Sequence, residues 1–163
     1  MTLGLATLVM ALGLPSFGQL VADKRLRTEV DALFHAIHQA RSESIARRRV
    51  VTICPSRDGK YCEPDNDWSG GWILFVNKGQ QNTDIREDDE VVLKYHQTDG
   101  RSRIVANRQS FSLRGTVLRA TNGTIVFCDA AARAENRALV VSYTGRPRVT
   151  RMTTRGKPYE CAD

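Results

Sequence analysis

The first 49 residues constrain the fold most, because they read as one long helix of two different characters. Residues 1–22 carry no charged side chain. Residues 23–49 continue the helical pattern, with an apolar stripe on one side and charged residues on the other. An apolar half that passes directly into an amphipathic half predicts a membrane anchor that becomes the spine of a water-exposed head.

The apolar half has three interpretations. A cleavable signal peptide would have a basic start, which this segment lacks, and LVA before Asp23 is a poor cleavage site. An ordinary membrane span is long enough, since about 20 apolar residues cross a bilayer. Pro15, with Gly4, Gly13 and Gly18, predicts instead a kinked and closely packed helix. The third interpretation is a pilin-type helix, which lies first in the membrane and later in the core of a filament.

The amphipathic half has a predicted core face and a predicted solvated face. The core face recurs at three- and four-residue steps and comprises Leu26, Val30, Leu33, Phe34, Ile37 and Ile45. The solvated face comprises Glu29, Asp31, His35, His38, Gln39, Arg41 and Glu43. His35 and His38 have a spacing that metal ligands use, but with no third ligand nearby we interpret them as solvated. Arg47–Arg49 would offset the C-terminal helix dipole, so the helix should end there.

The rest of the chain reads as short strands separated by turn residues. The clearest strands are expected at 50–54, 72–76, 91–95, 124–128 and 138–143, and weaker ones at 103–106, 110–113 and 148–152. A helix followed by strands predicts an α+β fold, with a mostly antiparallel sheet packed against one long helix. The acidic run at 86–90 lacks the spacing of a calcium-binding loop and is interpreted as a solvated loop.

Four cysteines predict two disulfides in an oxidising compartment, because they follow a membrane-targeting segment and lack zinc-site spacing. They are Cys54, Cys62, Cys128 and Cys161. Three connectivities are possible. We favour Cys54–Cys62, which closes a short polar loop, and Cys128–Cys161, which ties the tail to a late strand. The alternative is four reduced, buried cysteines.

Positive charge is concentrated in the C-terminal third of the chain. The whole chain has a net charge of +6, yet residues 101–163 hold 12 basic and 4 acidic side chains. Such an imbalance points to an anionic partner such as nucleic acid or a phosphate-bearing surface. A solubilising charged face is the competing interpretation.

The order of several short motifs resembles the FimT/GspH family of type IV pilin-like proteins, which comprises minor pilins and type II secretion pseudopilins. The most specific motifs are Ala40-Arg41-Ser42-Glu43-Ser44 in the helix and Gly71-Trp72-Ile73 in a strand. The others, in chain order, are Pro15-Ser16-Phe17, Leu26-Arg27, Val51-Thr52-Ile53-Cys54, Trp68, Gly123-Thr124, Cys128-Asp129 and Gly145-Arg146-Pro147-Arg148. The resemblance covers essentially the whole chain.

This resemblance implies a single-pass protein of the bacterial inner membrane with its head in the periplasm. Residues 1–22 would form the membrane and filament-core half of the helix, and residues 23–163 the head. Other pilin or pseudopilin subunits would bind through the N-terminal helix, in a type IV pilus or a type II secretion pseudopilus. Family precursors begin with a basic leader, a Gly-Phe processing site and a glutamate, whereas this chain opens inside the apolar helix. We therefore expect a longer reading frame upstream.

The GRPR stretch at 145–148 is the sharpest candidate site. Gly145 permits a tight turn, and Pro147 favours a strand start or a sheet edge. Arg146 and Arg148 would point to one face of an extended chain, about 6.5 Å apart, and could each bind a backbone phosphate. In the FimT branch a G-R-x-R element is associated with DNA binding during natural transformation, which the resemblance carries to Arg146 and Arg148. Other basic residues are added on electrostatic grounds: Arg151, Arg155, Lys157, Arg101 and Arg103.

The sequence therefore predicts a non-enzymatic filament subunit that binds double-stranded DNA without sequence specificity. No catalytic motif is present, and we expect no cofactor, metal or small-molecule substrate. Two alternatives stay open for the site: a purely structural pseudopilin, or a hairpin turn with solvated arginines. A secreted enzyme with a signal peptide is the remotest alternative.

Overall fold

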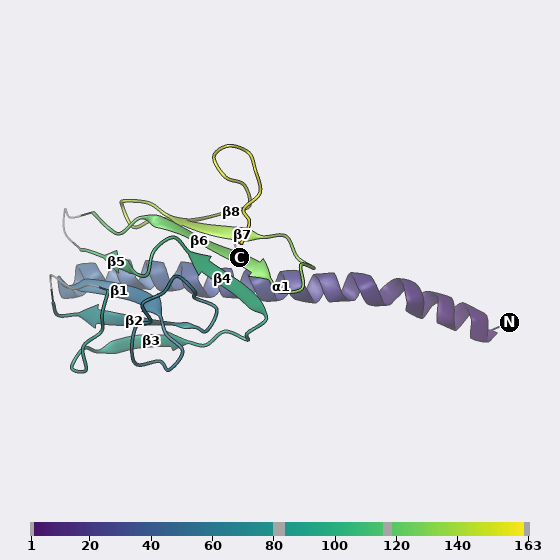
Figure 1. Cartoon of the computed structure of the whole chain (residues 1–163), viewed down its shortest axis with the longest axis horizontal. Helices are drawn as coiled ribbons and strands as arrows, with labels where there is room; N and C mark the ends of the chain where they lie inside the picture. Colours follow the sequence, from purple (N-terminus) through teal and green to yellow (C-terminus); the bar gives the residue numbers. More distant parts are fainter. Residues whose placement is uncertain (1, 80–83, 116–118, 162–163) are drawn as a thin grey trace.

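One helix runs the length of the head and extends beyond it (Figure 1). The computed structural model describes residues 2–79, 84–115 and 119–161, and only the backbone of residues 2–16. Helix α1 spans Thr2–Arg47 and continues through Pro15 without interruption. Its end at Arg47 confirms the predicted boundary. The division into residues 1–22 and 23–163 stays a prediction.

Two four-stranded antiparallel sheets pack on α1. The first sheet has the order β3-β2-β1-β5, and the second has the order β4-β6-β7-β8. Their strands are β1 (Val50–Pro55), β2 (Trp72–Asn77), β3 (Val92–His96), β4 (Ser102–Ala106), β5 (Phe111–Leu113), β6 (Gly123–Asp129), β7 (Arg137–Val141) and β8 (Pro147–Thr150). Each predicted strand has its counterpart, with boundaries shifted by a few residues. The predicted α+β fold, a long helix packed on antiparallel sheet, is confirmed.

The core forms where side chains of α1 meet the inner faces of both sheets. The helix contributes Leu26, Val30, Leu33, Ala36, Ile37 and Ala40. The sheets and connections contribute large side chains that include Trp68, Trp72, Phe111 and Phe127. Burying each Leu, Val or Ile side chain in this core stabilises the fold by roughly 1.5–3 kcal/mol. The amphipathic half of the helix is therefore held by tertiary packing.

The predicted core face of α1 is wrong near its C-terminal end. Ile45 is 54% exposed, and the neighbouring Ser44 is buried in its place. The cause lies at Gly115, whose missing side chain would collide with the backbone of Ser44 and Ile45. Because another stretch of backbone approaches the helix at this point, only a small side chain fits beneath it.

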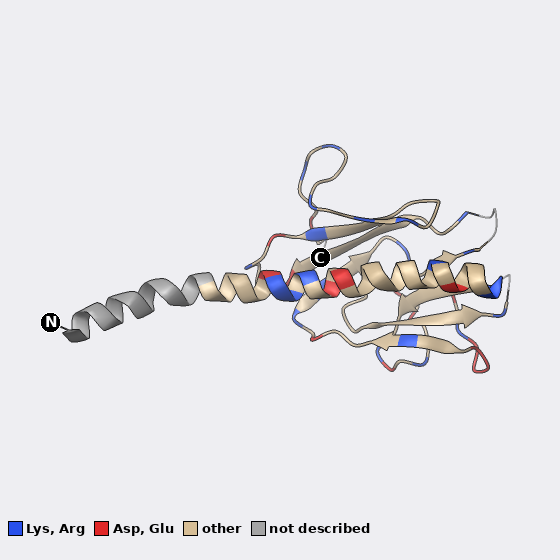
Figure 2. Ribbon diagram, turned by 180° about the vertical axis from the view of Figure 1, so that it is seen from behind, with Lys and Arg blue, Asp and Glu red and all other residues tan. Residues whose placement is uncertain are grey.

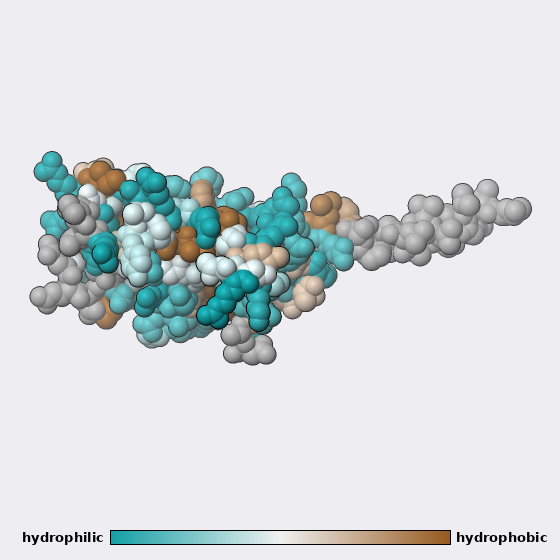
Figure 3. Space-filling model, turned by 90° about the horizontal axis from the view of Figure 1, so that it is seen from above, coloured by the Kyte–Doolittle hydropathy of each residue, from teal (hydrophilic) through white to brown (hydrophobic). Residues whose placement is uncertain are grey.

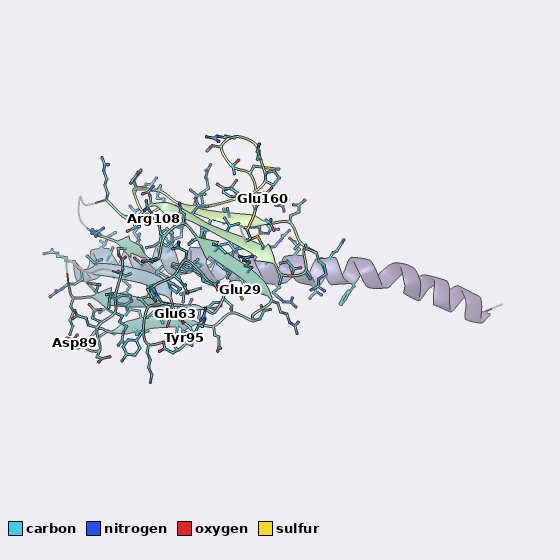
Figure 4. All side chains as sticks on the ribbon, in the orientation of Figure 1. Glu29, Glu63, Asp89, Tyr95, Arg108 and Glu160 are labelled. Carbon is cyan, nitrogen blue, oxygen red and sulfur yellow. A yellow bond between two sulfur atoms is a disulfide. The ribbon has the colours of Figure 1, made fainter. Side chains whose placement is uncertain are left out.

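Glu29 was assigned to the solvated face, and this prediction is also wrong. Its side chain is only 7% exposed, and Oε2 lies 2.8 Å from Nε2 of His96 at the end of β3 (Figure 4). Two neighbouring helix residues make ion pairs: Asp23 with Arg137 of β7, and Arg25 with Asp99 of the β3–β4 connection, each at 2.6 Å. Figure 2 shows red and blue bands on α1 where the helix enters the head. These two ion pairs and the Glu29–His96 hydrogen bond join α1 to both sheets.

Two disulfides close the head, with the predicted connectivity Cys54–Cys62 and Cys128–Cys161. Cys54 lies in β1, and its sulfur packs with Ile73 and Phe75 in a second apolar cluster outside the main core. Cys128 lies in β6, so its disulfide holds the C-terminal segment against the second sheet.

Among the described residues, no helical stretch combines the length and apolarity needed to cross a membrane. Most of the predicted anchor, residues 1–22, has side chains outside the described part.

Candidate nucleic-acid interface

The GRPR stretch forms a turn and the start of an edge strand, as predicted. The amide of Gly145 donates to the carbonyl of Ser142 at 2.9 Å, and the amide of Ser142 donates to the carbonyl of Arg146 at 3.1 Å. Gly145 has φ of 70°, a conformation that residues with a side chain adopt only at a cost. Pro147 begins β8, which lies at the edge of the second sheet, so its missing amide leaves no sheet hydrogen bond unmade.

Arg146 and Arg148 are both exposed, and neither makes an ion pair with any carboxylate among the described residues. Arg148 lies opposite Val140 in the β7–β8 pair. Val140 is half-buried, whereas its neighbours Leu139 and Val141 belong to the core. Because side chains alternate along a strand, Arg148 points away from α1, on the outer face of the second sheet. Figure 3 views the molecule from this side and shows white and brown patches between hydrophilic side chains.

The other predicted basic residues are spread over the second sheet and its C-terminal extension. Arg151 makes an ion pair with Glu135 at 2.8 Å, so its charge is partly compensated. Arg155 and Lys157 lie in the hairpin after β8, where the amide of Thr153 donates to the carbonyl of Lys157. This hairpin is the loop that projects from the head in Figure 1.

Arg101 and Arg103 do not lie beside GRPR. Arg103 is on β4, at the opposite edge of the sheet from β8, and Arg101 precedes that strand. Two strands separate β4 from β8, which corresponds to roughly 14 Å across the sheet. The structure therefore does not join all seven predicted residues into one compact patch.

Two arginines that were not predicted lie near the GRPR turn. Arg114 and Arg119 come from the β5–β6 connection, where the amide of Ala120 donates to the carbonyl of Tyr143 at 3.0 Å. The Arg119 guanidinium lies over the Tyr143 ring, 5.6 Å from its centre. No local sequence pattern could have identified this neighbourhood, because it depends on which strands pair.

The histidines and cysteines give no sign of a reactive centre. His35 and His38 are exposed on α1, each edge-on to the Phe34 ring. All four cysteines are in disulfides. Within the described ranges, no group of three or more histidine, cysteine, aspartate and glutamate side chains could hold a metal ion.

Comparison with known proteins gives one family and one fold. The family model of the type II transport protein GspH matches residues 29–145. The structure is similar to two crystal forms of the type IV minor pilin FimU of Pseudomonas aeruginosa, at 17% sequence identity. The TM-scores are 0.56 and 0.58, and the matches cover 76% and 78% of this chain and 91% and 89% of FimU. Among curated protein sequences, none matches this chain significantly.

Proposed function

The chain belongs to the GspH family, so its role is that of a pilin-like structural subunit, and we propose that its head also binds double-stranded DNA. The host filament is a type IV pilus or a type II secretion pseudopilus, and the subunit is a minor pilin or pseudopilin within it. Binding is to the DNA backbone and independent of sequence. Natural transformation is the process that such a receptor would serve.

The arrangement of α1 supports a filament role. Phe17 and Leu20 are 66% and 59% exposed, and they lie just before Asp23 and Arg25, whose ion pairs join the helix to the head. Figure 3 shows brown, apolar surface at the point where the helix leaves the head. Removing exposed apolar surface of this kind from water, by contact with a second apolar surface, lowers the free energy. We assign that cover to the inner membrane before assembly and to helices of other subunits afterwards.

Variants of these apolar residues test the filament role. Phe17→Asp with Leu20→Asp should prevent recovery of the protein in membranes and sheared filaments of the native host. A change of the same charge at two exposed positions of α1 within the head, Thr28→Asp with Ser42→Asp, should leave both fractions unchanged. Normal membrane and filament recovery of the Phe17/Leu20 variant would overturn this part of the proposal.

The DNA-binding role rests on the exposed, uncompensated pair Arg146 and Arg148 at the edge of the second sheet. Arg148 lies on β8, and Arg146 lies two residues earlier, directly before that strand, where its carbonyl accepts from the amide of Ser142. Because this pairing continues the β7–β8 ladder to Arg146, we assign the two guanidinium groups to a common face. Each guanidinium can bind a phosphate with two parallel hydrogen bonds. Such contacts release counterions from DNA, so affinity should fall steeply with salt concentration.

A salt-dependent titration tests this role. The full chain, in a nonionic detergent, is titrated against a labelled random-sequence duplex beside the Arg146→Ala/Arg148→Ala variant. Wild-type binding should weaken steeply between 50 and 200 mM salt, and the variant should lose most of it. Lys24→Ala with Lys60→Ala removes the same charge from exposed sites elsewhere and should retain binding. Absence of wild-type binding at low salt would overturn the DNA-binding role and leave a purely structural pseudopilin.

A further inference from the structure

The β5–β6 connection packs directly against the turn that carries Arg146. A Cβ atom on Gly145 would lie 2.7 Å from Cδ1 of Leu113 and 3.3 Å from Cβ of Ala120. Leu113 immediately precedes Arg114, and Ala120 immediately follows Arg119. The chain therefore places the backbone of Arg114 and of Arg119 next to residues that contact the turn before Arg146.

These arginines form one uncompensated group, which we call the distal arginine cluster: Arg114, Arg119, Arg146 and Arg148. None of the four makes an ion pair with a carboxylate in the described part of the chain. Arg114 donates from Nη1 to the carbonyl of Arg119 at 3.1 Å, so one member positions the backbone of another. Like charges held close together repel one another, and an anionic partner would relieve this repulsion.

Tyr143 holds Arg119 in this cluster. The ring is 58% exposed and lies under the Arg119 guanidinium, 5.6 Å from ring centre to Cζ. A cation–π contact at an exposed site stabilises such an arrangement by about 0.5–1 kcal/mol. The hydroxyl group makes no hydrogen bond within the described residues, so Phe should replace Tyr here without loss.

The cluster lies at the end of the head farthest from the emerging helix. Arg41, in the penultimate turn of α1, donates to the carbonyl of Thr144 beside Gly145. The backbone of Gly115 approaches Ser44 of the same helical segment. Figure 1 shows this end of the head opposite the N-terminal part of α1. Covering the exposed part of the helix in a membrane or filament therefore leaves the cluster open to a ligand.

We propose that Arg119 and Arg114 form the second half of the DNA-binding site, and that the C-terminal hairpin with Arg155 and Lys157 lies outside it. This inference rests on the proposed function and assigns its contacts. The ligand is the phosphate backbone of a DNA duplex, bound by guanidiniums from two separate connections. Four phosphate contacts correspond to a slope of about −3.6 in log affinity against log salt concentration.

The experiment compares two variants with the same change in charge. Arg114→Ala/Arg119→Ala should lower duplex affinity at least tenfold and reduce the salt slope by about 2. Arg155→Ala/Lys157→Ala should change affinity less than threefold. Because Arg114 is half-buried, the single variant Arg119→Ala, at an exposed position, should also lower affinity and reduce the slope by about 1. Tyr143→Ala should weaken binding, and Tyr143→Phe should restore it. Thermal unfolding followed by circular dichroism checks that each variant is folded.

The outcomes separate this inference from the proposed function. Equal losses in the two charge-matched variants would overturn the inference, because net charge alone would then explain binding. A larger loss in the hairpin variant would overturn it as well. Loss of binding in Arg146→Ala/Arg148→Ala, with no change in Arg119→Ala, would overturn the inference alone. No duplex binding by the wild type, or binding only to vesicles of anionic phospholipid, would overturn both.

Discussion

Asp23 and Arg137 form an ion pair of 2.6 Å between Oδ1 and Nη2, although 114 residues separate them in the chain. The Arg137 side chain is only 10% exposed, and its Nε has no hydrogen-bond partner in the described structure. Asp23 therefore compensates most of a nearly buried charge. The pair joins the helix to the second sheet at the point where the helix enters the head.

This ion pair predicts a specific loss of stability in acid. The hydrogen bond from Arg137, opposed by desolvation and followed by the charges of Arg137 and Arg27, lowers the pKa of Asp23 below its ordinary value of 3.8. Ionised Asp23 therefore stabilises the folded state fully at pH values above its unfolded-state pKa. This stabilisation is lost as the pH falls through its folded-state pKa. Asp23→Asn should cost roughly 1–2 kcal/mol near pH 7. It should also lose less stability than wild type between about pH 5 and pH 3.

Urea unfolding at several pH values checks this prediction. Asp31→Asn provides the control, because Asp31 is exposed on the same helix and has no ion pair among the described residues. Equal acid sensitivity in wild type and Asp23→Asn would contradict the assigned role of the pair. The comparison between variants is needed because Asp58 and Asp67 also have a lowered pKa and contribute to the acid transition.

Gly145→Ala should destabilise the head more than Gly156→Ala. Both glycines have positive φ, at 70° and 72°, so each alanine costs about 1–2 kcal/mol in backbone strain. Only at Gly145 would the new Cβ also collide with Leu113, whereas Gly156 has no atom within 4 Å of that position. The additional collision should cost about 1–3 kcal/mol. Equal urea midpoints for the two variants would show that Leu113, at the end of β5, does not restrict this turn.

Loss of the two disulfides should have unequal effects. Their sequence separations are 33 residues for Cys128–Cys161 and 8 for Cys54–Cys62. The loop-entropy model gives about 4 and about 2.5 kcal/mol for their stabilisation of the folded state. Paired Cys→Ala variants, unfolded in urea, check this order. Cys161→Ala alone should free the C-terminal segment and leave DNA affinity within about threefold of wild type, since the distal arginine cluster precedes that segment.

Ile37→Ala and Ile45→Ala should differ sharply, although the helical period assigns both to one stripe. Ile37 is fully buried in the core, so its truncation should cost about 2–5 kcal/mol. Ile45 is exposed, so its truncation should stay within about 0.5 kcal/mol of wild type. Chemical unfolding of the two variants under one condition is sufficient. A large effect at Ile45 would mean that the sequence period, and not the packed structure, describes the helix face.

Most of the fold was predictable because the relevant signals are local. The helical period from Leu26 to Ile37 marks a core face, and alternating apolar residues mark the strands. The exposure of Ile45 and the burial of Glu29 were not predicted, because both depend on contacts with residues distant in the sequence. Backbone from the β5–β6 connection covers Ser44 in preference to Ile45, and His96 of β3 supplies a partner for Glu29.

The candidate site was predictable only in its central part. The turn at Gly145 and the exposure of Arg146 and Arg148 follow from short-range chemistry. Arg103 was grouped with them because the number of charges along the sequence does not reveal that β4 and β8 lie at opposite edges of the sheet. Arg119 was not predicted, because its position near the turn likewise depends on which strands pair. Its proximity to Tyr143 arises after β5 pairs with β1 in one sheet and β6 pairs with β7 in the other.

The unbroken helix from Thr2 to Arg47 also determines how the head would bear a mechanical load. A force pulling on the emerging helix acts along the axis on which both sheets are packed (Figure 1). The ion pairs at Asp23 and Arg25, the hydrogen bond at Glu29 and the apolar contacts beyond them would then be sheared together, and not peeled apart one after another. Axial traction should therefore detach the helix at a much higher force than sideways bending of the same helix.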